Sequence, residues 1–249
     1  MTTTHATSTT SSSRHRPKGV RARQITHHIR KEEQLNLAYG HLKEEDVPTI
    51  SEALNKTRRL TLLDLRGNDR VGDDGARLLA EGLRTNRTVT TIDLSDCHIG
   101  DEGMGQICEA LKVNKTLHTL LLGLNPGISH VGAAKLGEAL QHNKTLRAVS
   151  LYRCSIGDEG ASHLAESLAH NSTLESLTLF NNKIGNNGAQ KLLDSMNQND
   201  TLQKLELRCN PIENGMLEQI ARMVQLNKDS KSAKEEKAEE EESGGAGGQ

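Results

Sequence analysis

The chain has 249 residues, of which 34% are hydrophobic, and its only aromatic residues are Tyr39, Tyr152 and Phe180. A composition this lean in large side chains leaves a core to be built from Leu, Ile, Val and Ala. The formal net charge is −2, and no apolar run approaches the roughly 18–20 residues that cross a bilayer, which excludes a transmembrane protein.

The first 31 residues contain seven Lys and Arg and no acid, and residues 1–19 are rich in Ser and Thr. We expect a disordered basic tail over residues 1–31, because such a segment has too few apolar side chains to form a core. Ile25 and Ile29, four residues apart, are expected on one face of a short helix that closes the N-terminal end of the next domain. A targeting segment, a nuclear-import signal or a nucleic-acid-binding patch remains the alternative.

Residues 32–228 repeat one pattern with a period of 28 or 29 residues. Six units fit L-x-x-L-x-L-x-x-N/C, with Val or Ile in place of Leu at Val89, Ile92 and Val149, and begin at Leu60, Val89, Leu117, Leu146, Leu174 and Leu202. A degenerate unit precedes them and has Glu32 in the first leucine position. The fourth and sixth residues alternate inward as a short strand requires, and later residues such as Leu164 and Leu168 have helical spacing. Such units bury their apolar faces only by stacking, which predicts an α/β solenoid with a parallel concave sheet and outer helices.

The pattern resembles the leucine-rich repeats over residues 32–228. Its unit length and the alternation at the ninth position resemble the ribonuclease-inhibitor subtype, on the residues Asn68, Cys97, Asn125 and Cys154. Asn182 and Asn210 end the alternation. The resemblance implies a horseshoe of about seven repeats whose surface recognises another protein.

The stretches HIGDEG at 98–103 and SIGDEG at 155–160 place acidic residues between glycines. The same slot reads VGDDG, ISHVG and IGNNG in other units, so it tolerates Asp, Glu, Asn, Ser or His. Because a metal site requires particular ligands, we interpret the slot as the start of each helix, where Asp101 and Asp158 cap free N–H groups. Calcium or phosphate binding is the alternative.

Five Asn-x-Thr sequences match the N-glycosylation acceptor and begin at Asn86, Asn114, Asn143, Asn171 and Asn199. Their register at the helix ends indicates a structural role, and we expect each Asn to end its helix in the left-handed conformation. We also expect no secretory signal and four reduced cysteines, with Cys97 and Cys154 structural and Cys209 more exposed. These features predict a cytoplasmic protein.

Positions three, five and seven of each unit point onto the concave sheet, and position eight lies at its edge. The partner-binding residues predicted from these positions are Tyr152, Phe180, Arg153, Arg208, Leu121, Leu124, Asp93 and Asp64. The face runs from acidic through apolar to aromatic and basic. Tyr and Arg are frequent hot-spot residues at interfaces, which predicts that Tyr152 and Phe180 anchor a protein partner. The alternative is that the two rings pack on each other.

Residues 229–249 are acidic and end in glycines, which predicts a second disordered tail. Its Ala, Lys and Glu residues could extend the last helix of the domain for a few turns.

No Ser/His/Asp or Cys/His set converges on neighbouring concave positions, and the eleven His are scattered. We therefore predict a monomeric, non-enzymatic module that binds a protein partner, without metal, cofactor, small-molecule substrate, membrane or nucleic acid. Two alternatives come from resemblance alone. The Ran GTPase activators resemble the chain in repeat subtype and acidic tail, and Arg66, Arg153 and Arg208 are its available arginines. The tropomodulins resemble it in repeat subtype, which implies a cytoskeletal or axonemal scaffold.

Overall fold

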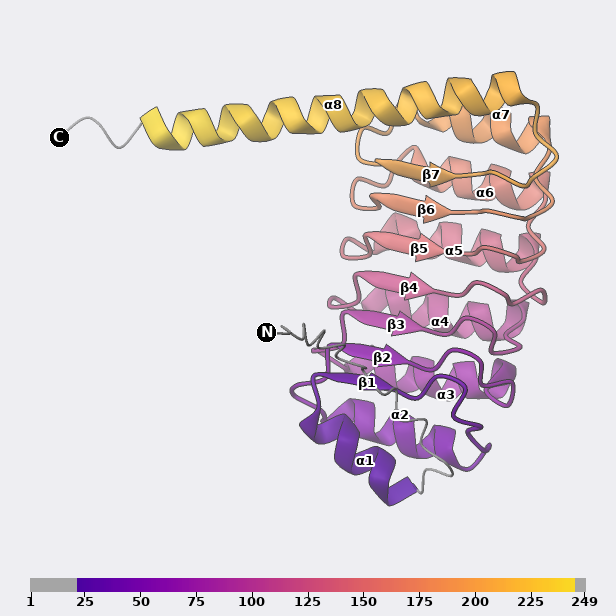
Figure 1. Cartoon of the computed structure of the whole chain (residues 1–249), viewed down its shortest axis with the longest axis vertical. Coiled ribbons are helices and arrows are strands. Elements are labelled where there is room, and N and C mark those ends of the chain that lie inside the picture. The colour runs from indigo at the N-terminus through magenta and orange to yellow at the C-terminus, as the bar shows by residue number, and fades with distance from the viewer. Residues whose placement is uncertain (1–21, 245–249) are drawn as a thin grey trace, which may run out of the picture.

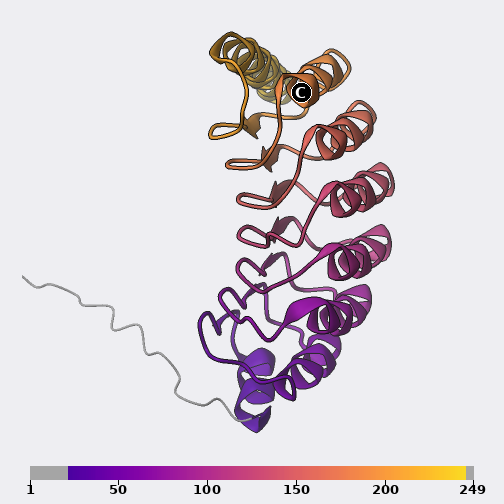
Figure 2. The same cartoon turned by 90° about the vertical axis from the view of Figure 1, so that its right-hand side faces the viewer.

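The computed structural model describes residues 22–244 and forms one parallel sheet backed by a row of helices (Figure 1). The strands, in sheet order, are β1 (Gln34–Asn36), β2 (Leu62–Asp64), β3 (Thr91–Asp93), β4 (Thr119–Leu121), β5 (Ala148–Ser150), β6 (Ser176–Thr178) and β7 (Lys204–Glu206). The helices are α1 (Ala22–Lys31), α2 (Asp46–Lys56), α3 (Gly72–Thr85), α4 (Asp101–Val113), α5 (His130–His142), α6 (Asp158–Leu168), α7 (Asn186–Ser195) and α8 (Asn214–Gly244). The strands line the inner side of an arc and the helices its outer side, which confirms the predicted solenoid (Figure 2).

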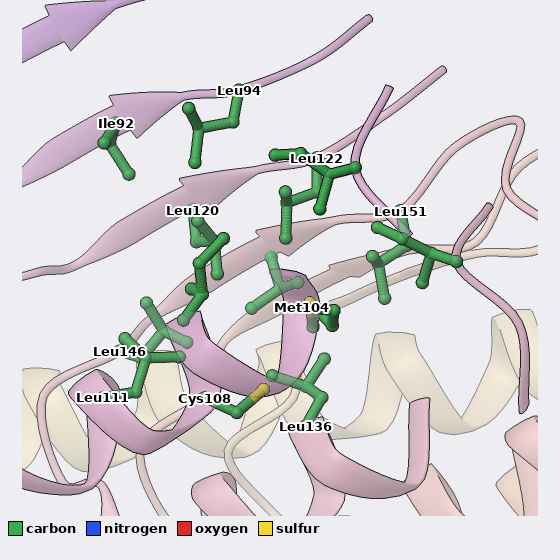
Figure 3. Packing of buried hydrophobic residues seen from close by; sticks show 14 of the residues in the cluster. Ile92, Leu94, Met104, Cys108, Leu111, Leu120, Leu122, Leu136, Leu146 and Leu151 are labelled. Carbon is green, nitrogen blue, oxygen red and sulfur yellow. The ribbon is translucent and has the colours of Figure 1, made fainter. Parts of the chain in front are cut away.

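The core lies between the sheet and the helices. Leu120 of β4 is in register with Ile92 of β3 and Val149 of β5, and all three are at most 2% exposed. Figure 3 shows the inward leucines of successive strands above Met104 and Cys108 of α4. Because the register never slips, equivalent apolar side chains stack along the whole arc, and each repeat is buried by its neighbours.

The acidic residues at the helix starts bind the following repeat. Asp101 of α4 accepts hydrogen bonds from the backbone N–H groups of Ser129 at 2.8 Å and Gly132 at 2.7 Å, at the start of α5. Asp73 and Asp158 each accept the same pair of bonds from the next repeat. A side chain at Gly132 would place its Cβ 2.6 Å from the Asp101 carboxylate, so the glycine is required there. The predicted bonds to N–H groups at a helix start are present, but they go to the helix of the next repeat, and neither α4 nor α6 has a side-chain cap at its own start.

The asparagines of the Asn-x-Thr sequences form a buried ladder that joins the repeats. Asn143 is 0% exposed, and its side-chain amide donates to the Leu111 carbonyl at 2.7 Å and accepts from the N–H groups of Thr145 and Leu146. Its φ is −80°, and none of the five asparagines has a positive φ. The predicted left-handed conformation is therefore wrong. An amide both donates and accepts, so the position requires Asn for its side-chain bonds rather than for its backbone freedom.

Helices close both ends of the solenoid. At the N-terminal end, α1 packs on α2 and buries Ile25 and Ile29 completely. Residues 1–21, the greater part of the predicted basic tail, lie outside the described residues. At the C-terminal end, α8 packs against α7 and β7 through side chains that include Ile220 and Val224.

Helix α8 then continues past Lys228, where Lys231 pairs with Glu175 of the sixth repeat, and its remaining part projects away from the stack as far as Gly244 (Figure 1). Residues 229–244 are thus helical, where an acidic disordered tail was predicted. Ala, Lys and Glu all have high helix propensity, and neither Pro nor Gly interrupts the segment between Gly215 and Gly244. Within residues 22–244, no helix has both the length and the apolar character needed to cross a bilayer.

Candidate functional site

The concave face consists of the outward side chains of the strands together with positions seven and eight of each repeat. Position eight has a positive φ, between 52° and 71°, in all seven repeats. The residues there are Tyr39, Gly67, Asp96, Leu124, Arg153, Asn181 and Cys209. This left-handed turn ends each strand and is followed at once by a position-nine residue, which in the middle repeats is a buried Asn or Cys. Side chains at position eight therefore lie at the edge of the concave face.

Four apolar side chains on this face remain half-buried: Leu121, Leu124, Tyr152 and Phe180. We call them the apolar patch. Leucines that point inward from the same strands are covered by the helices and are 0% exposed. The apolar patch differs from this core because no described part of the protein covers its outer side. Among the described residues, the ring-to-ring contact is that between His27 and His28, and none joins Tyr152 to Phe180.

Tyr152 is positioned by the glycine of the preceding repeat. Its ring lies over Gly123, where an added Cβ would come 1.9 Å from the ring carbon Cε1. Burial raises the pKa of the Tyr152 hydroxyl, and the negative charge of Asp93 raises it further. The Tyr152 ring therefore leans toward the N-terminal half of the face. Because the pKa of its hydroxyl is raised, the hydroxyl keeps its proton at neutral pH.

The two acidic residues predicted to contact a partner are largely buried beside an arginine. Asp64 is 7% and Asp93 is 9% exposed. The Arg66 guanidinium donates from Nη2 to Asp64 at 2.8 Å, and its Nε lies 3.9 Å from Asp93. Arg66 was not among the predicted binding residues, yet it is the more exposed member of this group.

At the opposite end of the face, Arg208 is exposed and held by its own strand. It donates from Nε and Nη2 to the two carboxylate oxygens of Glu206, at 2.8 and 2.7 Å. These hydrogen bonds lower the pKa of Glu206. Arg153 is exposed at position eight, and within residues 22–244 its side chain forms no hydrogen bond or ion pair. The described part of the face therefore offers one unpaired arginine among the predicted binding residues.

Sequence reasoning missed Tyr39, the third aromatic residue. It is 51% exposed and lies at position eight of the degenerate first repeat, with its ring over Gly67. All three aromatic residues of the chain therefore lie on the concave face. Leu35 and Leu37, in the fourth and sixth positions of that unit, gave the register that could have located Tyr39.

The four cysteine thiols of the chain differ in burial. Burial raises the pKa of the Cys97 and Cys154 thiols to about 12 and raises that of Cys108 as well. Cys209 is exposed, as predicted. Within residues 22–244, no three His, Cys, Asp or Glu side chains are grouped closely enough to hold a metal ion.

Comparison with known families decides the classification. The family model described as "Leucine Rich repeat" matches residues 58–80, 85–108, 142–165 and 170–193, each of which spans a strand and most of the following helix. The chain is a leucine-rich-repeat protein. Its helix in every repeat and its period of 28 or 29 agree with the ribonuclease-inhibitor-like subtype.

Solved structures share the leucine-rich-repeat fold at low identity. Actin-binding site 2 of leiomodin-1 is 18% identical, with a TM-score of 0.59, and the match covers 65% of this chain and 94% of that one. The C-terminal domain of tropomodulin from Caenorhabditis elegans is 12% identical, with a TM-score of 0.56, covering 66% and 97%. No curated protein sequence gives a significant match. Likeness at these identities establishes the fold.

Proposed function

We propose that this leucine-rich-repeat protein is a non-enzymatic interaction module that binds a protein partner on its concave face. The apolar patch is the observation that supports the proposal. Tyr152 and Phe180 stay half-buried on the concave face, whereas the inward leucines of the same repeats, such as Leu151 and Leu179, are 0% exposed. Covering such side chains with a partner removes apolar surface from water, and aromatic anchors contribute most to affinity when they are fully desolvated.

The charges on either side of the patch support a defined orientation for the partner. The N-terminal half carries Asp64, Asp93 and Asp96 against the single cation Arg66, and the C-terminal half carries Arg153, Lys204 and Arg208 against Glu206. A partner segment with charges of opposite sign at its two ends is attracted in one direction and repelled in the other. Electrostatics then selects the direction, and the patch provides the contact area.

A double variant tests the proposal. Tyr152→Ala together with Phe180→Ala should abolish capture of partners that proximity labelling with the full chain identifies in its source cell. Val131→Ala is the matched control, because Val131 is 41% exposed on the outer helix α5 and should leave capture unchanged. Undiminished capture by a double variant whose thermal stability equals that of the wild type would defeat the proposal.

Actin is the first named candidate for the partner. The structural neighbour from leiomodin-1 is an actin-binding site, and a scaffold on actin filaments fits an extended solenoid with a concave sheet. Co-sedimentation with filamentous actin and binding to monomeric actin test whether actin is the partner. If neither form binds, cytoskeletal scaffolding through actin is excluded, while recognition of another protein partner is not.

The non-enzymatic part of the proposal has its own test. Arg66 is engaged by Asp64 and Arg208 by Glu206, which leaves Arg153 as the unpaired arginine of the three suggested by resemblance to the Ran GTPase activators. We expect the wild type to leave the rate of GTP hydrolysis by Ran unchanged. Stimulation that is lost in Arg153→Ala would show that the protein regulates a GTPase.

A further inference from the structure

Two tyrosines lean toward each other from opposite sides of the third repeat. Tyr39 of the first repeat lies over Gly67 of the second, and Tyr152 of the fifth lies over Gly123 of the fourth. The third repeat, between them, contributes Ser95, which is small and 2% exposed, at the seventh position that Gly123 occupies in the fourth repeat, and Asp96 at the eighth position that Gly67 occupies in the second. Figure 1 shows the corresponding strands β1 to β5 side by side in the sheet. The absence of side chains at Gly67 and Gly123 therefore leaves room above the sheet for the two rings.

The charges between the tyrosines do not balance. Asp64, Asp93 and Asp96 face a single cation, Arg66, which gives this group a formal charge of −2. Arg66 forms its short bond with Asp64, whereas its Nε is buried without a hydrogen bond and lies 3.9 Å from Asp93. Asp96, half-buried at position eight, forms no side-chain hydrogen bond or ion pair within residues 22–244. One carboxylate is thus weakly compensated and another is not compensated at all.

The ionisation of Tyr152 agrees with this geometry. Burial raises the pKa of its hydroxyl first, and then Asp93 and Tyr39 raise it further, while Arg66 lowers it. Burial lowers the pKa of the Arg66 guanidinium, but the negative charges of Asp64 and Asp93, together with Tyr39, raise it overall. These shifts agree with a location of both tyrosines on the part of the concave face that holds Arg66 and Asp93.

We propose that this region, which we call the tyrosine clamp (Tyr39, Tyr152, Asp93 and Asp96), receives a lysine or arginine side chain of the protein partner. The proposal rests on the proposed function and names the chemistry that the partner must present. A cation placed between aromatic rings is attracted by their faces, and an adjacent carboxylate neutralises its charge. The basic side chain would be followed, toward the C-terminal repeats, by an apolar one that covers Phe180.

Other kinds of ligand fit the clamp less well. An acidic side chain could reach Arg66, but it would meet a group whose formal charge is −2 and would be repelled. An apolar side chain would cover Asp96 without providing any partner for its carboxylate, and burying an unpaired charge is costly. Only a basic side chain gains from both the aromatic rings and the unpaired carboxylate.

The test begins with a phage-displayed library of random dodecapeptides, selected against the full chain. The enriched peptides should combine a Lys or Arg with an apolar or aromatic residue. For a selected peptide, Tyr39→Ala and Asp96→Asn should each weaken binding by about tenfold, and raising the salt concentration should weaken it further. Replacing the basic residue of the peptide by Gln should have the same effect as Asp96→Asn.

Control variants separate the possible failures. Glu166→Gln removes an acidic residue that is exposed on the outer helix α6, and it should leave peptide binding unchanged. Peptides that require Phe180 but tolerate Tyr39→Ala and Asp96→Asn would overturn the tyrosine clamp alone. Peptides indifferent to Phe180→Ala as well would overturn the proposed function.

The basic N-terminal segment is the other conceivable occupant of the clamp. A variant with Arg14, Arg16, Lys18 and Arg21 all replaced by Ala should bind the selected peptide as the wild type does. Tighter peptide binding by that variant would identify this segment as a competitor and would overturn the proposal of an external partner.

Discussion

At the scale of single residues, the four cysteines differ sharply in environment. Burial raises the pKa of the Cys97 and Cys154 thiols from the ordinary 9.0 to about 12, whereas Cys209 is exposed at a left-handed turn. Only the thiolate is nucleophilic, so a buried thiol with a raised pKa reacts slowly. In the folded protein at pH 8, we expect one thiol to react rapidly with Ellman's reagent and the other three to react only on unfolding. Cys209→Ser should remove the rapid phase, and a rapid phase that persists would contradict this assignment.

The same thiols make stability depend on pH in the alkaline range. The unfolded chain loses the Cys97 proton near pH 9, while the folded protein retains it up to about pH 12. Their contribution to the free energy of unfolding is therefore complete below pH 9 and decreases as the pH rises toward 12. Urea unfolding at pH 8 and pH 10.5 should show this loss, which Cys97→Ala should reduce.

The aspartate caps give a second prediction at this scale. Asp101 accepts two backbone bonds from the next repeat, and Asp101→Ala should lower the free energy of unfolding by about 1–2 kcal/mol. The adjacent Glu102 is exposed, and its side chain makes no bond within the described residues, so Glu102→Ala is the matched control. Equal effects of the two substitutions in urea unfolding would show that helix-dipole charge, rather than the cap, is what matters.

At the scale of elements, α8 combines a packed half and a projecting half. Ile220 is 2% exposed against the last repeat, and Ile220→Ala should cost about 2–4 kcal/mol. Ending the chain after Lys228 removes the projecting half and the ion pair of Lys231 with Glu175, which is about a third exposed. Such a pair is worth about 0–1 kcal/mol, so the truncation should cost less than Ile220→Ala while lowering helicity in circular dichroism. A larger loss on truncation would place a stabilising contact beyond residue 228.

The strands and helices of the six regular repeats could be predicted from two spacings of the apolar residues. They alternate with a period of two over each strand and recur every three or four residues over each helix. The role of the asparagines could not be predicted, since Asn at a helix end is compatible with a left-handed backbone or with side-chain bonds across repeats. Asn143 makes the latter, to Leu111 of the preceding repeat. The choice between the two roles depends on the preceding repeat, because the Leu111 carbonyl that Asn143 binds lies 32 residues away in sequence.

The candidate site was predictable in part. The apolar patch follows from the register of Tyr152 and Phe180, and the structure leaves both half-buried. Tyr39 was missed because the binding residues were predicted from the six regular repeats alone, although Leu35 and Leu37 place Tyr39 at position eight of the first repeat. The engagement of Asp64 by Arg66 depends on side-chain conformation within one strand and turn, which the pattern of outward positions does not specify.

At the scale of the whole molecule, the solenoid separates stability from recognition. The core, the aspartate caps and the asparagine ladder all lie between the sheet and the helices or between successive repeats, so the concave side chains are free to vary without loss of the fold. What the arc presents is a surface with Asp64, Asp93 and Asp96 beside Arg66 toward its N-terminal end, an apolar centre, and Lys204 and Arg208 beside Glu206 toward its C-terminal end. Recognition by that surface is the central claim.

Hydrogen–deuterium exchange of the full chain, with and without a partner identified by proximity labelling, tests this claim most directly. We predict slower exchange at the ends of β4, β5 and β6 and in the turns at positions 123–125, 152–154 and 180–182, with exchange in helices α3 to α7 unchanged. Slower exchange confined to those outer helices would place the binding surface on the convex side and contradict the account.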